Sequence, residues 1–236
     1  TLIRQRFGEY PIVSLENNDL RLDVVPELGG RIVGVTLKSS GENILGRTDE
    51  LNYFYPAWGG YDESTTRTWR STGFANPYKA ELKGRTLTLT GAGLNGLVFR
   101  RTITVPEKGT SIAIASSISN SAANPAIARL VCRMELAVDP AEAAMWTPEK
   151  GQESAAEFYR DGQSKPSGSW RVENKNAGWL MENRFNPQMI EACRLVTDAR
   201  AKTVSMEILG FEQDLAPGRE LRLENVWEIK NLKSEP

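Results

Sequence analysis

The sequence predicts an all-β fold, a mainly antiparallel β-sandwich. Three observations support this: apolar and polar residues alternate with period two, β-branched residues gather in the same runs, and separators rich in Gly, Pro, Asn and Asp recur every 8 to 15 residues or so. No sustained helical period and no internal repeat is present. The chain has 236 residues, a length that large β-sandwiches reach as one unit, so we predict a single domain over residues 1–236.

The expected strands follow in chain order. Residues 20–24 alternate between apolar and charged side chains, the glycine-containing turn 26–30 comes next, and a second strand covers 31–37 before another turn at 39–43. The later expected strands are 85–91, 97–105, 110–119, 128–138, 193–199, 202–209 and 219–229. Trp179 and Trp227 lie near expected strand ends and are predicted to be core residues.

Two stretches interrupt this rhythm. Residues 46–80 are dense in aromatic residues and glycine, and residues 139–178 carry Pro, Gly, Ser and charged residues. Long irregular segments in compact domains are usually functional or disordered, and residues 152–170 (QESAAEFYRDGQSKPSGSW) of the second stretch are expected to form a mobile surface loop. Also within the second stretch, residues 140–146 (PAEAAMW) are the best helix candidate, with one or two turns.

Composition excludes several classes of partner. The 29 basic and 30 acidic residues give a formal net charge of −1, whereas nucleic-acid binders usually show a basic excess. No stretch approaches the roughly 18 consecutive apolar residues of a membrane span. We therefore expect no nucleic acid and no membrane as partner, but a neutral or weakly charged small molecule or another protein.

Cys132 and Cys193 are the two cysteines, and each lies in an apolar run. They are interpreted as buried small hydrophobic residues, although a disulfide is open if their strands are neighbours. The sequence begins at Thr1 with no signal-like apolar segment, which suits either a trimmed or excised chain or a mature exported protein. A periplasmic or secreted location is favoured over a cytoplasmic one.

Two segments carry a family resemblance. Residues 11–45 (PIVSLENNDLRLDVVPELGGRIVGVTLKSSGENIL) and residues 202–229 (KTVSMEILGFEQDLAPGRELRLENVWEI) resemble the beginning and the end of the galactose mutarotase-like (aldose 1-epimerase-like) superfamily. The chain is most similar to its small uncharacterised bacterial members. The resemblance implies a β-supersandwich, and it places Glu207 where those enzymes carry a glutamate base.

The chain departs from that family in its acid groups. Mutarotases open and close a sugar ring with a histidine acid, a glutamate base and a second histidine, and this chain contains no histidine. Where the family tends to have His-Gly-Phe, the sequence has Thr72, Gly73 and Phe74, and the mid-chain strand reads LVCRMEL. Glu207 thus remains as the candidate catalytic residue, and histidine-dependent mutarotation is not expected.

An aromatic segment is the first candidate binding element. Six aromatic residues fall within residues 53–69, where aromatic faces could pack on the C–H side of a sugar ring. The candidate substrate-binding residues there are Tyr55, Trp58, Tyr61, Asp62 and Trp69. The aromatic residues could instead plug one end of the sandwich or form a protein interface. Asp62 and Glu63 could contact hydroxyls or lie in a solvated loop, but two adjacent acids do not make a calcium site.

Two strands supply polar candidates. Arg133 and Glu135 alternate with apolar neighbours and therefore share one face of their strand, and Glu207 faces away from the apolar residues of its own strand. Together they would line a substrate pocket of mixed charge if both faces point to the same side of the sheet. Solvated outer faces are the alternative. Arg31, which follows the glycine pair of the turn, is predicted to form an ion pair.

Carbohydrate binding is therefore the predicted function, with a mono- or oligosaccharide as ligand and no cofactor or metal. An enzyme is the second hypothesis: a lyase, hydrolase or epimerase that uses Glu, Tyr and Arg in place of His, with Arg133, Glu207, Tyr55 and Tyr61 as the available groups. Polysaccharide lyases also contain supersandwich domains, which the chain resembles only in fold. A structural domain attached to other domains of a larger glycan-processing protein is the third.

Overall fold

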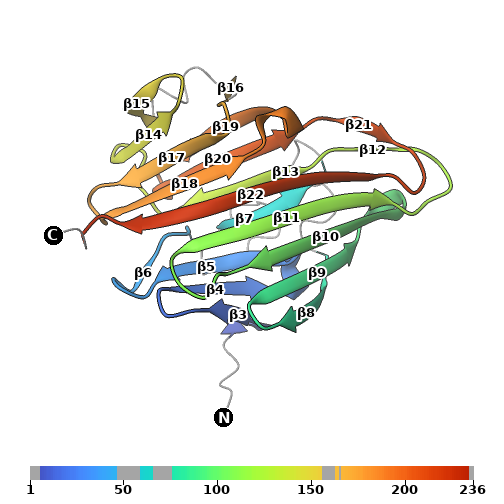
Figure 1. The fold of residues 1–236 in the computed structure, drawn as a ribbon, viewed down its shortest axis with the longest axis horizontal. Coiled ribbons are helices and arrows are strands. Elements are labelled where there is room, and N and C mark those ends of the chain that lie inside the picture. Colours follow the sequence, from blue (N-terminus) through green and yellow to red (C-terminus); the bar gives the residue numbers. More distant parts are fainter. Residues whose placement is uncertain (1–5, 47–58, 66–75, 156–162, 165, 234–236) are drawn as a thin grey trace, which may run out of the picture.

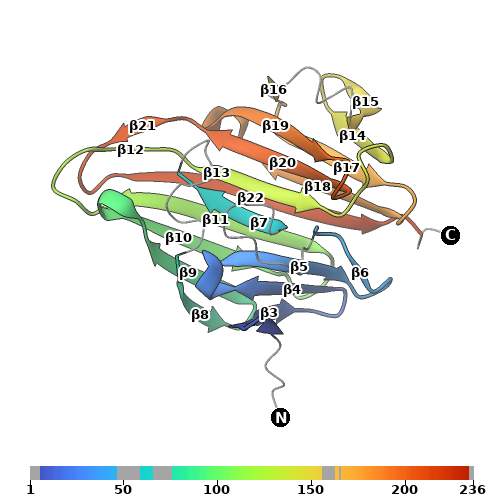
Figure 2. The same cartoon turned by 180° about the vertical axis from the view of Figure 1, so that it is seen from behind.

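Two large antiparallel sheets face each other, with the hydrophobic core between them (Figures 1 and 2). The structure, a computed structural model, describes residues 6–46, 59–65, 76–155, 163–164 and 166–233. We call the two layers sheet I and sheet II. The predicted all-β antiparallel sandwich is confirmed.

Sheet I has the strand order β15-β14-β17-β18-β22-β11-β10-β9-β8. Its strands are β8 (Lys79–Lys83), β9 (Thr86–Ala92), β10 (Leu97–Thr104), β11 (Ser111–Asn120), β14 (Ala143–Thr147), β15 (Gly151–Ser154), β17 (Ser169–Asn174), β18 (Trp179–Phe185) and β22 (Glu220–Asn231).

Sheet II has the order β16-β19-β20-β13-β7-β5-β4-β3, with β6 paired to β5. Its strands are β3 (Val13–Glu16), β4 (Leu20–Val25), β5 (Arg31–Leu37), β6 (Glu42–Asn43), β7 (Gly60–Ser64), β13 (Val131–Leu136), β16 (Gln163–Ser164), β19 (Ile190–Asp198) and β20 (Thr203–Gly210).

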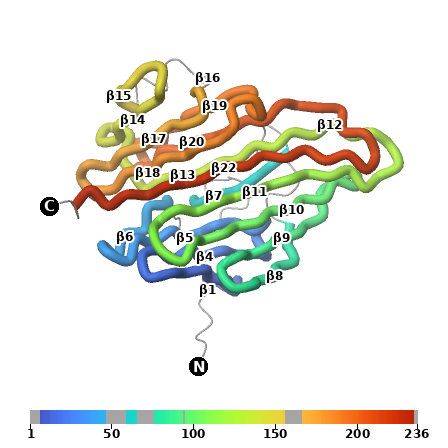
Figure 3. Tube along the Cα trace, in the orientation of Figure 1, coloured from blue at the N-terminus to red at the C-terminus, as the bar shows by residue number. Residues whose placement is uncertain are grey.

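Short elements complete the described chain. β1 (Arg6–Phe7) pairs with β2 (Tyr10–Pro11). β12 (Ala126–Ala128) pairs with β21 (Gln213–Leu215), although β12 and β21 are far apart in sequence (Figure 3). Three 3-10 helices cover Pro26–Leu28, Leu94–Gly96 and Pro187–Met189. None of the helices in the described part is long and apolar enough to cross a membrane.

Period-two alternation builds the core. Along β22, every second residue from Leu221 to Ile229 is buried, whereas Arg222, Glu224 and Val226 between them are exposed. Trp179 and Trp227 are fully enclosed, which confirms their predicted core position. Burying such a large apolar side chain contributes about 1.5–3 kcal/mol relative to leaving it exposed, so this alternation is the main source of the sandwich's stability.

The helix expected at residues 140–146 is wrong. Pro140 lies in a turn in which Glu142 N–H donates to the carbonyl of Asp139 (2.8 Å), and residues 143–147 form β14. Met145 and Thr147 are buried, and Trp146 points to the other face. Pairing with β15 and β17 thus overrides the helix propensity of the alanines.

The two stretches expected to be irregular contain strands. Residues 46–80 include β7, a central strand of sheet II between β13 and β5, and residues 139–178 include β14, β15, β16 and β17. The surface loop expected over residues 152–170 is therefore wrong where β15, β16 and the start of β17 cover its described residues. All side chains of β7 are buried, including two charged ones, so β7 lacks the alternation of apolar and polar residues that predicts a strand.

A buried ion pair joins the two sheets. Arg101 of β10 points inward, with Nε 2.8 Å from Oε1 of Glu63 on β7, and its Nη1 donates to the carbonyl of Gly30 (2.6 Å). The Tyr61 and Ser116 hydroxyls also donate to Glu63 Oε1. Both Arg101 and Glu63 are almost completely enclosed, so each charge depends on its partner.

Replacing Arg101 with methionine tests this dependence. The variant leaves the Glu63 carboxylate buried without its cation, and we expect the free energy of unfolding to fall by about 3–5 kcal/mol. Urea denaturation measures the change. Arg85→Met, which removes an exposed pair with Glu107, is the control and should cost less than about 1 kcal/mol. Equal losses in the two variants would contradict the role of the Arg101–Glu63 pair.

Candidate functional site

Five charged side chains from five neighbouring strands form one row across the outer face of sheet II. They alternate in sign, and we call the row the charge ladder. In strand order it consists of Arg31 (β5), Asp62 (β7), Arg133 (β13), Glu207 (β20) and Arg194 (β19). The register of the strands makes the row, because Arg133 lies opposite both Asp62 and Glu207, and Glu207 also lies opposite Arg194.

Alternation along each strand sets these directions. Cys132, Met134 and Leu136 of β13 are buried among the apolar residues between the sheets, so Arg133 and Glu135 project to the outer face. On β20, Val204, Met206 and Ile208 point into the core. Glu207 therefore faces away from the core, as the sequence predicted, and it projects to the same side as Arg133.

Gly60 allows β7 to approach β5 at this point. Its φ is +77°, and a Cβ added there would lie 2.0 Å from the carbonyl oxygen of Ile32. The glycine thus permits the close approach that brings Asp62 to Arg31.

Hydrogen bonds connect the ladder. Arg31 Nη2 donates to Asp62 Oδ2 (2.9 Å) and its Nη1 donates to the carbonyl of Gly59 (2.7 Å). Arg133 Nη1 lies 3.5 Å from Asp62 Oδ1, and Arg133 Nε donates to Glu207 Oε1 (2.7 Å). Arg194 Nε donates to Glu207 Oε2 (2.6 Å). Asp62 and Glu207 are thus each held between two guanidinium groups.

The ladder's carboxylates favour the charged form of Arg133. Burial lowers the pKa of Arg133, but Asp62 and Glu207 outweigh burial and hold this pKa above its ordinary value. Burial lowers the pKa of Arg31, and Asp62 opposes that effect. Three guanidinium groups thus face two carboxylates, and Arg194 is the ladder's most exposed member, with 30% of its side chain accessible.

Glu135 lies next to the ladder on β13, opposite Gly60 on one side and Ser205 on the other. It is partly buried, and burial raises its pKa from 4.5 to about 7, against the opposing attraction of Arg31. Among the described residues, none donates a hydrogen bond to this carboxyl group. A carboxyl group that titrates near neutral pH can both accept and release a proton.

Glu207 and Glu135 therefore differ in their environments. Both oxygens of Glu207 accept hydrogen bonds from guanidinium groups, so protonating it would break charge-assisted contacts. The Glu135 carboxyl group has no such partner in the described chain. The geometry suits Glu207 as an anchor for two arginines, and it suits Glu135 for proton transfer.

Four sequence-predicted site residues come together: Asp62, Arg133 and Glu207 in the ladder, and Glu135 beside it. Asp62 lies in a buried strand and not in a solvated loop, and the ion pair expected for Arg31 is confirmed. Tyr55, Trp58 and Trp69 fall outside the described residues, as do Thr72, Gly73 and Phe74.

Tyr61 lies on the opposite face from Asp62. Its ring is 1% exposed in the core, 5.0 Å from the ring of Trp227, and its hydroxyl donates to Glu63. Burial raises the pKa of Tyr61 well above 10. This placement agrees with a packing role and is unsuited to sugar stacking or to a tyrosine base.

Sequence reasoning missed Arg194. The signal was present, because Arg194 alternates with Cys193 and Leu195 on an expected strand, but its pairing with Glu207 depends on the register between β19 and β20. No group of three or more Cys, Asp or Glu side chains able to hold a metal ion occurs in the described part of the chain.

The two cysteines are free and buried. Cys132 and Cys193 both lie opposite Ile208, on the two sides of β20. Two strand spacings of about 4.8 Å separate their backbones, beyond the roughly 7 Å limit for a disulfide. The interpretation as buried small residues is confirmed.

Comparisons with known proteins agree with the fold. A galactose mutarotase-like protein from Lactobacillus casei superimposes with a TM-score of 0.71 at 8% identity, over 93% of this chain and 100% of that chain. A galactose mutarotase related enzyme from Lactobacillus acidophilus gives 0.70 at 10% identity, over 95% and 99%. A TPR-domain containing protein from Parabacteroides distasonis gives 0.73 at 15% identity, over 96% of this chain and 49% of that one.

The chain therefore has the galactose mutarotase-like fold, and the predicted supersandwich is confirmed. A family described as a domain of unknown function (DUF5107) matches residues 3–64, which include Arg31 and Asp62. No curated protein matches the chain.

Replacing Glu135 with glutamine tests its environment. The folded-state pKa of about 7 lies above the ordinary 4.5, so between these values the folded protein holds a proton that the unfolded chain has released. Wild-type stability should therefore fall as pH rises from 4.5 to 7 and then level off. Glu135→Gln should lose this dependence, so that the variant gains about 2 kcal/mol on the wild type between pH 5 and pH 8.

Urea denaturation at a series of pH values measures this difference. Glu81→Gln, on the exposed edge strand β8, is the control and should follow the wild type. A wild type and a Glu135→Gln variant with parallel stability profiles would refute the raised pKa.

Proposed function

We propose that the protein binds a mono- or oligosaccharide on the outer face of sheet II, at the charge ladder and Glu135. The observation that carries the proposal is the ladder itself: guanidinium and carboxylate groups from five strands, fixed by one another on a sheet face. Such a row is preorganised, because its side chains are ordered before any ligand arrives.

Sugar hydroxyl groups match this arrangement chemically. Each hydroxyl both donates and accepts hydrogen bonds, and the ladder alternates donors with acceptors from strand to strand. Arg133 and Arg194 have 11% and 30% of their side chains exposed, and each guanidinium has five N–H donors. The solvent-facing donors of these two arginines and the Glu135 carboxyl group would contact the ligand.

The fold neighbours support a sugar ligand by name only, since the two Lactobacillus proteins are described as galactose mutarotase-like or related. This chain contains no histidine, so we do not propose histidine-dependent mutarotation for it. Binding without that reaction is the proposal.

A second candidate function is proton transfer on the bound sugar, and Glu135 favours it. Its pKa of about 7 is the property that an acid–base group needs at neutral pH, and Arg31 and Arg133 lie close enough to act on its charge. The enzyme hypothesis then uses Glu135 in place of the previously expected Glu207 and Tyr61.

A thermal-shift titration tests binding. Neutral monosaccharides, uronic acids and short oligosaccharides are added to the wild type, and a ligand at a hundredfold excess over its Kd should raise Tm by roughly 5–10 °C. Arg194→Lys keeps the charge but loses the planar fork, so the same shift should require about tenfold more ligand. Arg222→Lys, on sheet I, should respond like the wild type. No shift with any sugar, or an unchanged shift in Arg194→Lys, would overturn the site.

Turnover separates the two candidate functions. If glucose or galactose binds, the interconversion of its anomers is followed by polarimetry. Catalysis through Glu135 predicts a pH–rate profile with an inflection near 7, and a loss of about 10²–10⁴ in rate in Glu135→Gln with Kd preserved. Binding without rate enhancement at any pH would leave the binding function alone.

A further inference from the structure

A stacked Trp–Arg pair lies on the other side of the molecule from the charge ladder. On the outer face of sheet I, Trp146 of β14 lies opposite Arg171 of β17 in the strand register, and the guanidinium carbon is 3.6 Å from the centroid of the indole ring. Stacking at this distance fixes the guanidinium plane and leaves its N–H donors pointing outward at the edges.

A depression of about 140 Å³ adjoins this pair. Ala144 and Leu180 supply apolar surface, and Gln152 and Glu173 supply an amide and a carboxylate. The volume lies below the roughly 300 Å³ of a typical pocket for a drug-sized ligand, so it suits a single ring or the terminal unit of a chain.

Arg171 brings unused hydrogen-bonding capacity to the depression. Its Nε is buried and has no hydrogen-bond partner, and no described residue forms an ion pair with its guanidinium. A buried donor without an acceptor is unfavourable, so a ligand oxygen that reaches the guanidinium would use hydrogen-bonding capacity that the described residues leave unused.

The carboxylates around Arg171 favour a neutral ligand over an anionic one. Glu173 lines the depression, and Glu182 lies opposite Arg171 on the neighbouring strand β18. The two carboxylates, of which that of Glu182 also binds Arg184 (3.0 Å), disfavour an anionic ligand, and the Glu173 carboxylate can accept hydrogen bonds from hydroxyl groups. The combination of indole and leucine surface with donors and carboxylate acceptors matches a pyranose ring, which has an apolar C–H face and polar hydroxyl edges.

We propose that Trp146, Arg171 and Glu173 form a second carbohydrate site, which takes a neutral pyranose unit on the outer face of sheet I. The site is independent of the charge ladder, because the two lie on opposite faces of the sandwich. The two sites could bind two separate sugars, or one oligosaccharide that passes around the edge of the sandwich.

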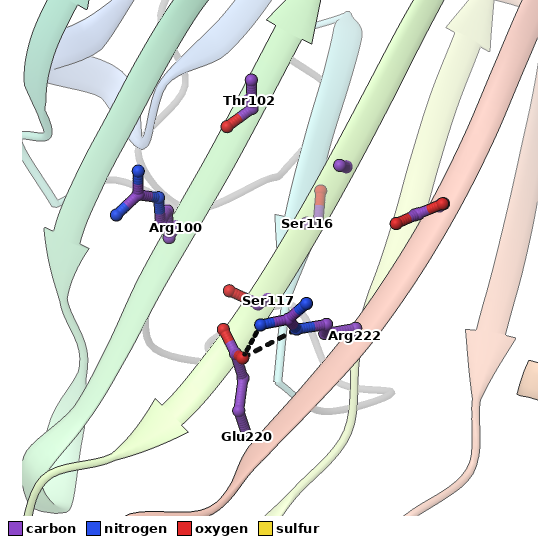
Figure 4. A pocket seen from close by; sticks show the side chains of 8 residues that line it. Arg100, Thr102, Ser116, Ser117, Glu220 and Arg222 are labelled. Atoms are coloured by element: carbon purple, nitrogen blue, oxygen red, sulfur yellow. Dashed lines mark hydrogen bonds and ion pairs between the residues drawn. The ribbon is translucent and has the colours of Figure 1, made fainter.

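Another depression on the same face makes a useful contrast. About 180 Å³ in volume, it lies between β10, β11 and β22 and is lined by Arg100, Ser117 and Glu220 (Figure 4). There Arg222 Nε donates to Glu220 (2.7 Å), so the charge of Arg222 is already paired. None of the described residues that line it is aromatic, which makes Arg222 a matched control.

NMR on the ¹⁵N-labelled full chain tests the proposal through the indole N–H resonance of Trp146, assigned by its loss in Trp146→Phe. The probes are methyl β-glucoside, methyl β-galactoside, maltotriose and cellotriose, with glucuronate and inorganic sulfate as anions. At least one neutral sugar should shift the resonance, and the shift should approach saturation at a sugar concentration of roughly 50 mM, which exceeds even a millimolar Kd.

Variants identify the groups responsible. Arg171→Lys should weaken binding at least about fivefold, because the ammonium group cannot reproduce the planar fork, and Glu173→Gln should weaken it also. Arg222→Ala and Glu207→Gln should leave the Trp146 response intact, which separates this site from the charge ladder. A retained response in Arg171→Lys and Glu173→Gln, no response to any neutral sugar, or a stronger response to glucuronate or sulfate would overturn the proposal.

Discussion

Strands β5 and β7 are clamped from both faces of sheet II at the same point. On the core side, Arg101 binds Glu63 of β7 and the carbonyl of Gly30, which immediately precedes β5. On the outer side, Arg31 binds Asp62. Since neighbouring residues on a strand face opposite ways, the consecutive pairs 30–31 and 62–63 each serve both clamps. A one-residue slip of β7 would turn Asp62 toward the core and Glu63 toward the outer face, away from the arginines that bind them, so the two ion pairs favour the register on which the charge ladder depends.

The sequence predicts the sandwich well because most strands follow a simple alternation. It fails where a strand breaks that rule: β7 carries Tyr61, Asp62 and Glu63 in succession, and all three are buried because partners on β5, β10 and β13 neutralise the charges. β14 was mistaken for a helix because alanines indicate helices in isolation, and only pairing with two neighbours makes them a strand.

The site could be predicted in part for a related reason. Which face Arg133, Glu135 and Glu207 occupy follows from alternation within one strand, and that prediction agrees with the structure. Which residues touch across strands follows from register, which is set by contacts distant in sequence, and so Arg194 was missed. The difference between Glu207, held by two arginines, and Glu135, partly buried and without a hydrogen-bond donor among the described residues, likewise appears only in three dimensions.

The two cysteines carry a consequence for the conditions under which the fold can exist. Burial raises the pKa of both thiols well above the ordinary value, so the reactive thiolate is scarce at physiological pH, and β20 keeps the two side chains from meeting. The sandwich neither gains a crosslink from an oxidant nor loses one to a reductant. With respect to these two thiols, the stability of the folded sandwich is thereby independent of the redox potential of its surroundings.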